Sequence, residues 1–491
     1  MMETFDYNLK LIIPEVFLFL WALTVIVFDV GTKRRKSDSV GYLTMAGLAV
    51  TGILLYNFHG GISFNNMFSS DILALFFKVI FLGSAFMAVG SSFGLASDKI
   101  KNHRGEYYGL ILFSTVGMMF LSSSNELISL YVGLELTTIP LFVLAAFYKD
   151  SKVSVEAGMK YLIVGAFSSA ILLYGLSLLY GFTGTTDLTM MKINLSLLFL
   201  SAGKIGPGLI LAIVMIVAGI GFKLALVPFH KWAPDVYQGA PTPITAFLSV
   251  GSKAAGVVAF ARIFVHGLIA FSDPVMKPLD WGIIVAVMAA AAMVLGNITA
   301  LRQHNIKRML AYSSIAQIGY LMIGMVAVSE LGIASIGFYM FVYLFANMGA
   351  FAVATLFNDE TGSDSIRSYS GLSKSSPALS ACMAIFLLSL AGIPPLGGFA
   401  AKYMVFAAGI EAGYNWLVIL GLLTAVVSLY YYANVIKLMY FSPDNSHVKI
   451  NIHPAARLVL VLGVVGIIII GIYPEPVLKI AMESAVLFAL P

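Results

Sequence analysis

Fourteen apolar stretches, most of them about as long as a membrane-spanning helix, follow one another along this chain. A helix needs about 20 apolar residues to cross the hydrocarbon core of a bilayer. The stretches are apolar on every face, whereas the strands of a membrane barrel alternate apolar and polar positions over about ten residues. We therefore predict an all-α polytopic membrane protein with about 14 transmembrane helices. The expected spans are residues 10–29, 39–58, 70–95, 106–123, 125–148, 156–181, 207–228, 242–268, 279–301, 307–328, 330–357, 377–410, 413–440 and 455–473.

The composition of the chain agrees with this class. Of its 491 residues, 59% are hydrophobic and only 11% are charged, and the mean hydropathy is +0.93. A soluble domain carries about a quarter charged residues, so no soluble core could hide this much apolar surface. The first stretch is too long for the apolar region of a signal peptide, and we expect it to be retained as the first span.

Several kinds of chemistry are disfavoured by the sequence. The single cysteine, Cys382, lies in an apolar run, and no Cys/His spacing suits zinc, haem or iron–sulfur ligation. Neither a GxGxxG nor a GxxxxGK[ST] loop is present. The net charge of +5 does not indicate nucleic-acid binding, because the basic residues lie in loops that flank the spans. We therefore expect no redox centre, no metal and no nucleotide site in this chain.

Lysine and arginine are distributed unequally between the two sets of loops. Eighteen of the 29 basic residues lie in the loops on one side of the expected spans, and only five lie on the other side. The positive-inside rule places the first set in the cytoplasm. Both termini are then expected outside the cytoplasm, as an even number of spans requires.

Two of the expected spans cannot be regular helices. The seventh reaches Pro228 and continues through Trp232 and Pro234. The twelfth contains the run AGIPPLGG, residues 391–398, which cannot remain helical. Two broken helices are therefore expected, the seventh and the twelfth, and each carries a lysine close to its break.

The spacing of the two breaks indicates an internal repeat. They lie five helices apart, and since five is odd, two five-helix units would face opposite ways across the membrane. Interrupted helices at matching positions of inverted repeats point to an ion path at mid-membrane, because broken backbone at that depth must be packed in protein or line a wet cavity. The expected segments are an N-terminal three-helix segment (1–105), the two repeats (106–270 and 271–441) and a C-terminal helix with a short tail (442–491).

Seven charged side chains fall inside the expected spans, where each costs ~2.5–3.5 kcal/mol or more at the bilayer centre. Among them, Lys223 and Lys402 lie next to the breaks, and we expect the break to supply polar groups and water for Lys223. Lys253 lies eleven residues into its helix among small residues, too deep to reach the interface easily. Glu135 lies ten residues into the fifth span, where it is either a titratable carrier or a hydrogen-bonded acid that ties two helices. The seven are Lys78, Glu135, Lys160, Lys223, Lys253, Arg262 and Lys402.

The remaining candidates have a second interpretation of comparable weight. Lys160 lies near the start of its helix, one turn after Glu156, so it could form an i,i+4 ion pair and extend to the interface. His230 lies just beyond the first break and could exchange protons with its surroundings near neutral pH, or it is an ordinary interfacial histidine. Lys78 and Arg262 are expected to extend their side chains to the outer interface.

A row of buried lysines and glutamates suits stepwise proton transfer. Burial moves the pKa of such side chains towards neutrality by up to about 3–5 units, and coupled neighbours discourage each other from binding protons. A pKa swing of about three units is worth about 4 kcal/mol, similar to moving one charge against ~180 mV. Without an energy source the row would only leak, so a driving partner is expected elsewhere.

At these residues the chain resembles a known family. It is similar to the antiporter-like membrane subunits of respiratory complex I, the NADH–quinone oxidoreductase, and especially to their subunit-N branch. Lys253, Gln317 and the lysine at Lys402 favour that branch over subunits L and M. The resemblance rests on GFKLALVPFHKWAPDVYQGAPTPITAFLSVGSKAAG (221–256), SSIAQIG (313–319) and GIPPLGGFAAK (392–402).

The resemblance implies a path and a role. Glu135 and Lys160 would form a switching pair, Lys223 would be the central carrier linked onward by His230 and Lys253, and Lys402 would lead to the outer side. The chain would translocate protons, driven by quinone reduction in partner subunits that carry NAD, FMN, iron–sulfur clusters and quinone. Subunits M and K would be its neighbours. The membrane would be a bacterial inner (plasma) membrane rather than a thylakoid.

Two other functions remain open at this point. The chain could belong to a sodium/proton antiporter or to a related ferredoxin-driven oxidoreductase. It could also be a scaffold with inert lysines, although inert charges would be costly to keep in lipid.

Overall fold

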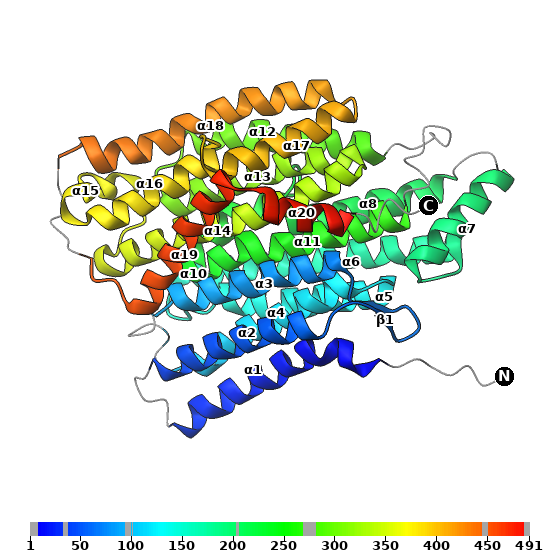
Figure 1. Cartoon of the computed structure of the whole chain (residues 1–491), viewed down its shortest axis with the longest axis horizontal. Coiled ribbons are helices and arrows are strands. Elements are labelled where there is room, and N and C mark those ends of the chain that lie inside the picture. Colours follow the sequence, from blue (N-terminus) through cyan, green and yellow to red (C-terminus); the bar gives the residue numbers. More distant parts are fainter. Residues whose placement is uncertain are drawn as a thin grey trace.

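A computed structural model describes residues 8–32, 38–93, 100, 102–202, 206–268, 281–443 and 450–485. Helices lie side by side along the longest axis, with α1 and α2 along one edge and α18 along the opposite edge (Figure 1). Nine of the basic residues that predict the orientation lie outside these ranges: Lys33, Arg34, Arg35, Lys36, Lys99, Lys101, Lys204, Lys277 and Lys449.

The N-terminal part has three long helices and one short hairpin, in which Ile62 pairs with Ser69. Asp71 caps the third of these helices by accepting a hydrogen bond from the backbone N–H of Ala74 (2.7 Å). The elements are η1 (Leu9–Ile12), α1 (Ile13–Gly31), α2 (Ser39–Asn57), β1 (Ile62–Ser63), β2 (Phe68–Ser69) and α3 (Ile72–Ser91).

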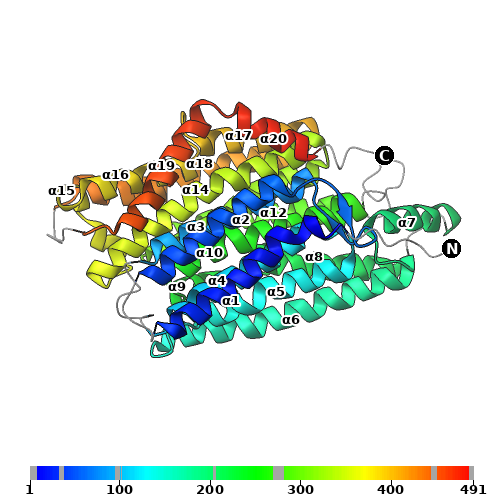
Figure 2. The same ribbon diagram turned by 60° about the horizontal axis from the view of Figure 1, so that its bottom comes forward.

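The middle part contains the first expected break, between α8 and α9, as the prolines predicted. It also contains α7, a helix that the apolar runs of the sequence do not predict, which projects from one end of the bundle (Figure 2). Its elements are α4 (Arg104–Ser123), α5 (Leu127–Ala145), α6 (Lys152–Thr183), α7 (Leu188–Ala202), α8 (Pro207–Leu224), α9 (Trp232–Gly239), α10 (Thr242–Phe247), the π-helical segment η3 (Leu248–Ser252), α11 (Lys253–Phe260) and the π-helical segment η4 (Ala261–Gly267).

The last part contains the second expected break, between α16 and α17, and ends in a short helix, α20, that was not expected. Its elements are α12 (Trp281–Ala300), α13 (Ile306–Ala327), α14 (Glu330–Thr361), η6 (Ile366–Tyr369), α15 (Leu372–Ser375), α16 (Pro377–Ala391), α17 (Gly397–Glu411), α18 (Asn415–Phe441), α19 (Pro454–Ile472) and α20 (Glu475–Ala485).

Twelve helices of the described ranges are long and apolar enough to cross a membrane, compared with the 14 expected. The two expected spans outside this set are α4, which is helical over 20 residues, and the interrupted α16–α17. The continuous helix from α10 to η4 is buried throughout, and α13 and α14 are almost as deeply buried. These three helices form the buried core of the bundle.

Candidate functional site

Lys223 lies at the first helix break, in the last turn of α8. The residue after α8, Ala225, adopts a left-handed backbone conformation with φ of 54°. Pro228 has no N–H with which to continue the helix. The indole of Trp232 donates to the carbonyl of Phe222 (3.0 Å), one of the acceptors that the helix end leaves free. The lysine side chain is buried beside this break.

The partner of Lys223 comes from α5. Its Nζ donates to Thr138 Oγ1 at 2.6 Å, and that hydroxyl donates to the carbonyl of Leu134. Glu135 lies one turn before Thr138 on the same helix. The hydrogen-bond partner of Lys223 that the described residues show is therefore a side chain of α5 and not a carbonyl of the broken backbone, which we had expected to supply polar groups. At the break, the carbonyl of Phe222 accepts from Ala225 and Trp232 instead.

Glu135 itself is incompletely satisfied. Its Oε1 atom is buried and has no hydrogen-bond partner in the part of the chain that the structure describes. A buried carboxylate oxygen without a partner is costly unless water or a proton occupies it. Glu135, Thr138 and Lys223 thus form one cluster between α5 and α8.

Lys160 does not belong to this cluster. Its Nζ lies 2.7 Å from Glu156 and 3.0 Å from Asp235 of α9, and its side chain is 44% exposed. The i,i+4 pair with Glu156 is the alternative that the sequence left open, and it is confirmed. The Glu135–Lys160 pair implied by the family resemblance is not formed.

The packing of α5 against α6 explains this separation. A Cβ on Gly158 would lie 2.3 Å from the Cβ of Ala146, and a Cβ on Gly165 would lie 2.5 Å from the ring of Phe142, so the two helices run antiparallel. Glu135 is two turns beyond Phe142 in the direction away from Gly158. Lys160, close to Gly158, therefore lies at a different depth.

His230 lies in the unwound segment between α8 and α9 and is buried. Burial lowers the pKa of its imidazole, and a hydrogen bond with the backbone of Pro228 partly offsets this. Its Nδ1 atom has no hydrogen-bond partner among the described residues. A buried, neutral imidazole with a free nitrogen can accept or pass on a proton.

Lys253 is the first residue after the π-helical segment η3, and its side chain is fully buried. Its Nζ donates to the hydroxyl of Ser314 (2.6 Å) and to the carbonyl of the same residue (3.0 Å) on α13. The hydroxyl of Tyr343 also donates to Ser314 (2.8 Å). One turn after Lys253, a Cβ on Gly256 would lie 3.5 Å from the Cβ of Lys223, so the helices of the two lysines meet here.

Lys402 lies at the second break, and here the broken backbone does supply the partners. Gly392 ends α16 with φ of 89°, a conformation that glycine adopts easily. The Nζ of Lys402 donates to the carbonyls of Leu390 and Ala391, both at 3.0 Å. Carbonyls at a helix C-terminus carry partial negative charge, which favours an ammonium. The Nζ also lies 4.9 Å from the centre of the Tyr320 ring.

Helix α13 connects the two ends of this row. The carbonyl of Leu390 also accepts a hydrogen bond from the amide of Gln317 (2.9 Å), which in turn contacts Tyr432 (3.3 Å). Ser314, the acceptor for Lys253, lies one turn before Gln317 on the same helix. Polar groups of α13 therefore lie between Lys253 and Lys402.

Two cavities adjoin Lys402. A small one of about 10 Å³ is lined by Gln317 and Tyr343 as well as by Lys402, which is room for roughly one water. A larger one of about 660 Å³ is lined mainly by apolar residues of α17 and α18, and Lys402 and Glu411 also line it.

In the described ranges, no three His, Cys, Asp or Glu side chains come together as a metal site requires.

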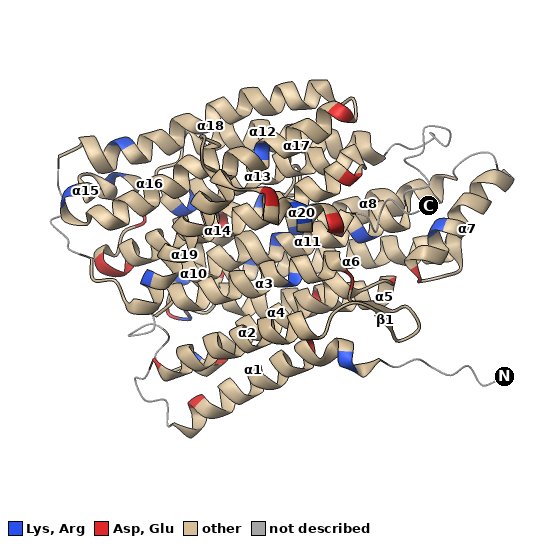
Figure 3. Cartoon of the chain, in the orientation of Figure 1, with Lys and Arg blue, Asp and Glu red and all other residues tan. Residues whose placement is uncertain are grey.

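Sequence reasoning missed two buried ion pairs. Lys78 pairs with Glu15 of α1 (2.6 Å), and Arg262 pairs with Asp71 (2.5 Å). Both basic side chains are buried, so the expectation that they extend to the interface is wrong. Glu15 lies in the first turn of α1, a mostly apolar helix, and an acid at that position was the signal that the sequence offered for a buried partner. Figure 3 shows charged residues near many of the helix ends, with some basic residues in the middle of the bundle.

Comparisons with known proteins identify the family of this chain. The family described as NADH:quinone oxidoreductase/Mrp antiporter, TM matches residues 124–428. A protein named NADH-quinone oxidoreductase subunit N from Desulforamulus reducens is 42% identical over 487 residues, covering 99% of this chain and all of the relative.

Solved structures show the same fold. A chain of respiratory complex I from Thermus thermophilus is 31% identical with a TM-score of 0.77, and the match covers 95% of this chain and 99% of that one. A chain of the Mrp complex from Dietzia is 20% identical with a TM-score of 0.81 and covers 97% of both chains, which is a likeness of fold. The chain therefore belongs to the antiporter-like membrane-subunit family of NADH:quinone oxidoreductases and Mrp antiporters, among the relatives named subunit N of NADH-quinone oxidoreductase.

Proposed function

We propose that this chain carries protons across the membrane as a subunit of an NADH–quinone oxidoreductase, along a row formed by Glu135, Lys223, His230, Lys253 and Lys402. The observation that supports the row most strongly is that three buried lysines come from three different helices and each donates to a polar acceptor inside the bundle. Inert ammonium groups at such positions would be costly. Lys160 stands apart from the row.

Each step of this path would be a proton transfer over a short distance. Lys223 and Glu135 would exchange a proton through Thr138 or a water at the free Glu135 oxygen. Lys253 would follow, because its helix meets Lys223 at Gly256. The polar groups of α13 would then lead to Lys402. Since neighbouring sites are coupled, a change in charge at one end alters proton affinity along the row.

The energy source would lie in partner subunits. The relatives are named as subunits of an NADH-quinone oxidoreductase, and we propose that NAD, FMN, iron–sulfur clusters and quinone bind to other subunits of the complex. This chain would then perform no bond chemistry beyond proton transfer. Its neighbours would be the antiporter-like subunit M and the small subunit K.

The proposed membrane topology has 14 crossings. Helix α4 and the interrupted α16–α17 would add two crossings to the twelve candidate spans. Residues 106–270 and 271–441 would form inverted repeats, each with one break, between an N-terminal three-helix segment (1–105) and a C-terminal segment (442–491). An even number of crossings and the unequal distribution of basic loops support termini outside the cytoplasm of a bacterial plasma membrane.

The test of this function uses the assembled complex in vesicles. Replacing Glu135, Lys223, Lys253 and Lys402 together by Gln or Met should abolish the protons pumped per electron while the subunits still copurify. Normal pumping by an assembled quadruple variant would instead make the chain a scaffold. Proton-driven sodium transport by the chain alone, with no redox partner, would favour an antiporter.

A further inference from the structure

Asp235 joins three helices at the first break. It lies on α9, and its Oδ2 atom lies 3.0 Å from the Nζ of Lys160 on α6. Its Oδ1 atom accepts a hydrogen bond from Arg308 of α13 at 2.7 Å. One carboxylate on the short segment after the break is thus shared by two basic side chains from the helices on either side of it.

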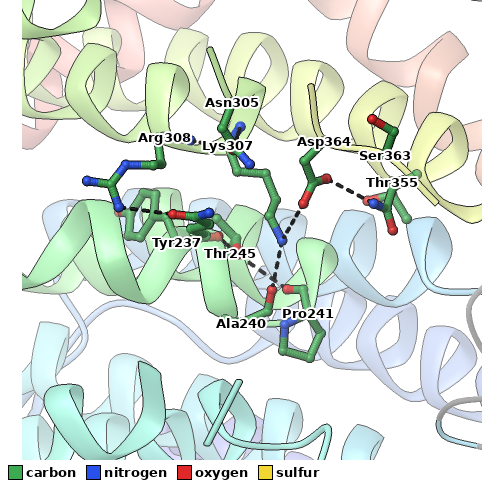
Figure 4. A network of polar contacts seen from close by, with 12 residues as sticks. Tyr237, Ala240, Pro241, Thr245, Asn305, Lys307, Arg308, Thr355, Ser363 and Asp364 are labelled. Carbon is green, nitrogen blue, oxygen red and sulfur yellow. Dashed lines mark hydrogen bonds and ion pairs between the residues drawn. The ribbon is translucent and has the colours of Figure 1, made fainter. Parts of the chain in front are cut away.

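The same segment has further attachments to α13. Arg308 also donates to Gln238 (3.0 Å), and the neighbouring Lys307 donates to the carbonyl of Ala240 (3.3 Å) and lies 3.4 Å from Asp364. Figure 4 shows Lys307 and Arg308 reaching from α13 to the end of α9 and the start of α10. Several polar contacts therefore attach this segment to α13. Among the described residues, the polar contact of Asp235 with α6 is the one with Lys160.

The surroundings of Lys160 differ from those of the three lysines in the row. Lys223, Lys253 and Lys402 are buried and donate to hydroxyl or carbonyl oxygens. Lys160 is half exposed and contacts two carboxylates. A carrier must give up its proton to the next group. The carboxylates of Glu156 and Asp235 instead stabilise the protonated, positively charged form of Lys160, so they oppose release of its proton. No contact in the described residues leads from Lys160 into the row.

We propose that Lys160 is a positioning residue, which with Asp235 clamps α9 between α6 and α13 and so fixes the unwound segment that follows Lys223 and carries His230. This inference rests on the proposed relay, because the segment matters only if protons pass there. The clamp needs a permanent positive charge at position 160 and no proton transfer from it.

Asp235 is suited to this role. Burial alone would raise the pKa of its carboxyl, but hydrogen bonds from Arg308 and Lys160 hold that pKa below its ordinary value. The carboxylate therefore stays ionised throughout the neutral range, and the clamp does not open with moderate changes in pH.

The decisive experiment compares K160R with K160M in the assembled complex. Arginine keeps the positive charge and can reach both carboxylates, but it does not release its proton at the pH of the assay. We expect K160R to retain proton yield per electron within about twofold of wild type. K160M and D235N should lower the yield severalfold and speed deuterium exchange of the peptide covering residues 225–240. E360Q, which removes an exposed carboxylate at the end of α14, should change neither quantity.

The opposite pattern would overturn the clamp. If K160R pumps as poorly as K160M while exchange of residues 225–240 stays at the wild-type rate in both, Lys160 is a carrier. Wild-type pumping and exchange in K160M and D235N would also contradict the proposal. The relay itself is tested separately by K223R, which should stop pumping because arginine cannot pass the proton on; normal pumping in K223R would defeat the relay whatever the result at position 160.

Discussion

Gln317 and Lys402 donate to the same backbone oxygen, the carbonyl of Leu390, at 2.9 and 3.0 Å. The acceptor is available because α16 stops at Gly392 and leaves its last carbonyls without helical partners. A neutral amide and an ammonium therefore meet at one atom. This arrangement connects the polar side of α13 to the lysine at the second break.

Removing the amide should interrupt this connection. In Q317L the hydroxyl of Tyr339, which donates to the Gln317 side chain, is left buried without that acceptor. We expect a loss of stability of about 1–3 kcal/mol and a severalfold lower proton yield in complex that still assembles. Thermal unfolding of the purified complex and pumping in vesicles measure the two effects. Q317H, which retains hydrogen-bonding nitrogens, should pump better than Q317L, and equal pumping would contradict a role for the amide.

Two adjacent threonines of α5 offer a matched comparison. Thr138 accepts from Lys223, whereas the hydroxyl of Thr137 donates to the carbonyl of Gly133 in its own helix. In T138V the buried ammonium loses a hydrogen bond worth about 1.5–3 kcal/mol, and proton yield should fall at least tenfold. In T137V pumping should remain near the wild-type value. Similar pumping in the two variants would show that the Lys223–Thr138 contact is not on the path.

The close approach at the second break has a steric test. A Cβ on Gly398 would lie 1.8 Å from the carbonyl oxygen of Ser389, and this backbone atom cannot move away cheaply. G398A should therefore displace α17 from α16, reduce the yield of assembled complex and abolish pumping in what remains. A Cβ added to Gly181, on α6, would have no atom within 4 Å. G181A should therefore leave the stability of the protein unchanged or raise it by up to about 1 kcal/mol. Normal assembly and activity of G398A would contradict this geometry.

The acid dependence of the α9 clamp follows from Asp235. Its pKa is lower in the folded protein than in the unfolded chain, where an aspartate titrates near about 3.9. Its contribution is therefore complete about one pH unit above the unfolded-state value, at about pH 5, and is lost as the pH falls through the lower, folded-state value. Deuterium exchange of residues 225–240, corrected for intrinsic rates, should show unchanged protection from pH 7 to about pH 5. The contrary result would be a loss of protection of residues 225–240 between pH 7 and about pH 5, equal in the wild-type protein and in D235N.

Much of the fold and several site residues follow from local sequence. Prolines and glycines predicted both helix breaks, and long apolar runs around Lys223, Lys253 and Lys402 predicted that these lysines would be buried. Each of these signals is contained in one segment of chain. The predictions succeeded because a missing N–H, or a charge in an apolar helix, has the same physical consequence whichever helices pack around it.

Pairings between helices could not be predicted in this way. The contact of Lys160 with Asp235, the contact of Lys78 with Glu15 and the depth of Glu135 all depend on how distant helices pack in register, and that register is set by close contacts such as Gly158 against Ala146. Helix α7 was not predicted because, at 15 residues, it is apolar but too short for a span. The Glu135–Lys160 pair that the family resemblance implied is not formed because of the same helix register. Sequence motifs identify the residues but not which side chains they contact.

The most direct measurement is the number of protons pumped per electron by assembled complex in which Lys223 is replaced by Ala, with quinone reduction followed in the same vesicles. A buried ammonium that donates to Thr138 beside Glu135 can be a central carrier only if pumping ceases when it is removed. We expect that the subunit still copurifies with its partners and that the proton yield falls to the background level of uncoupled vesicles. Wild-type proton yield in assembled K223A complex would contradict it.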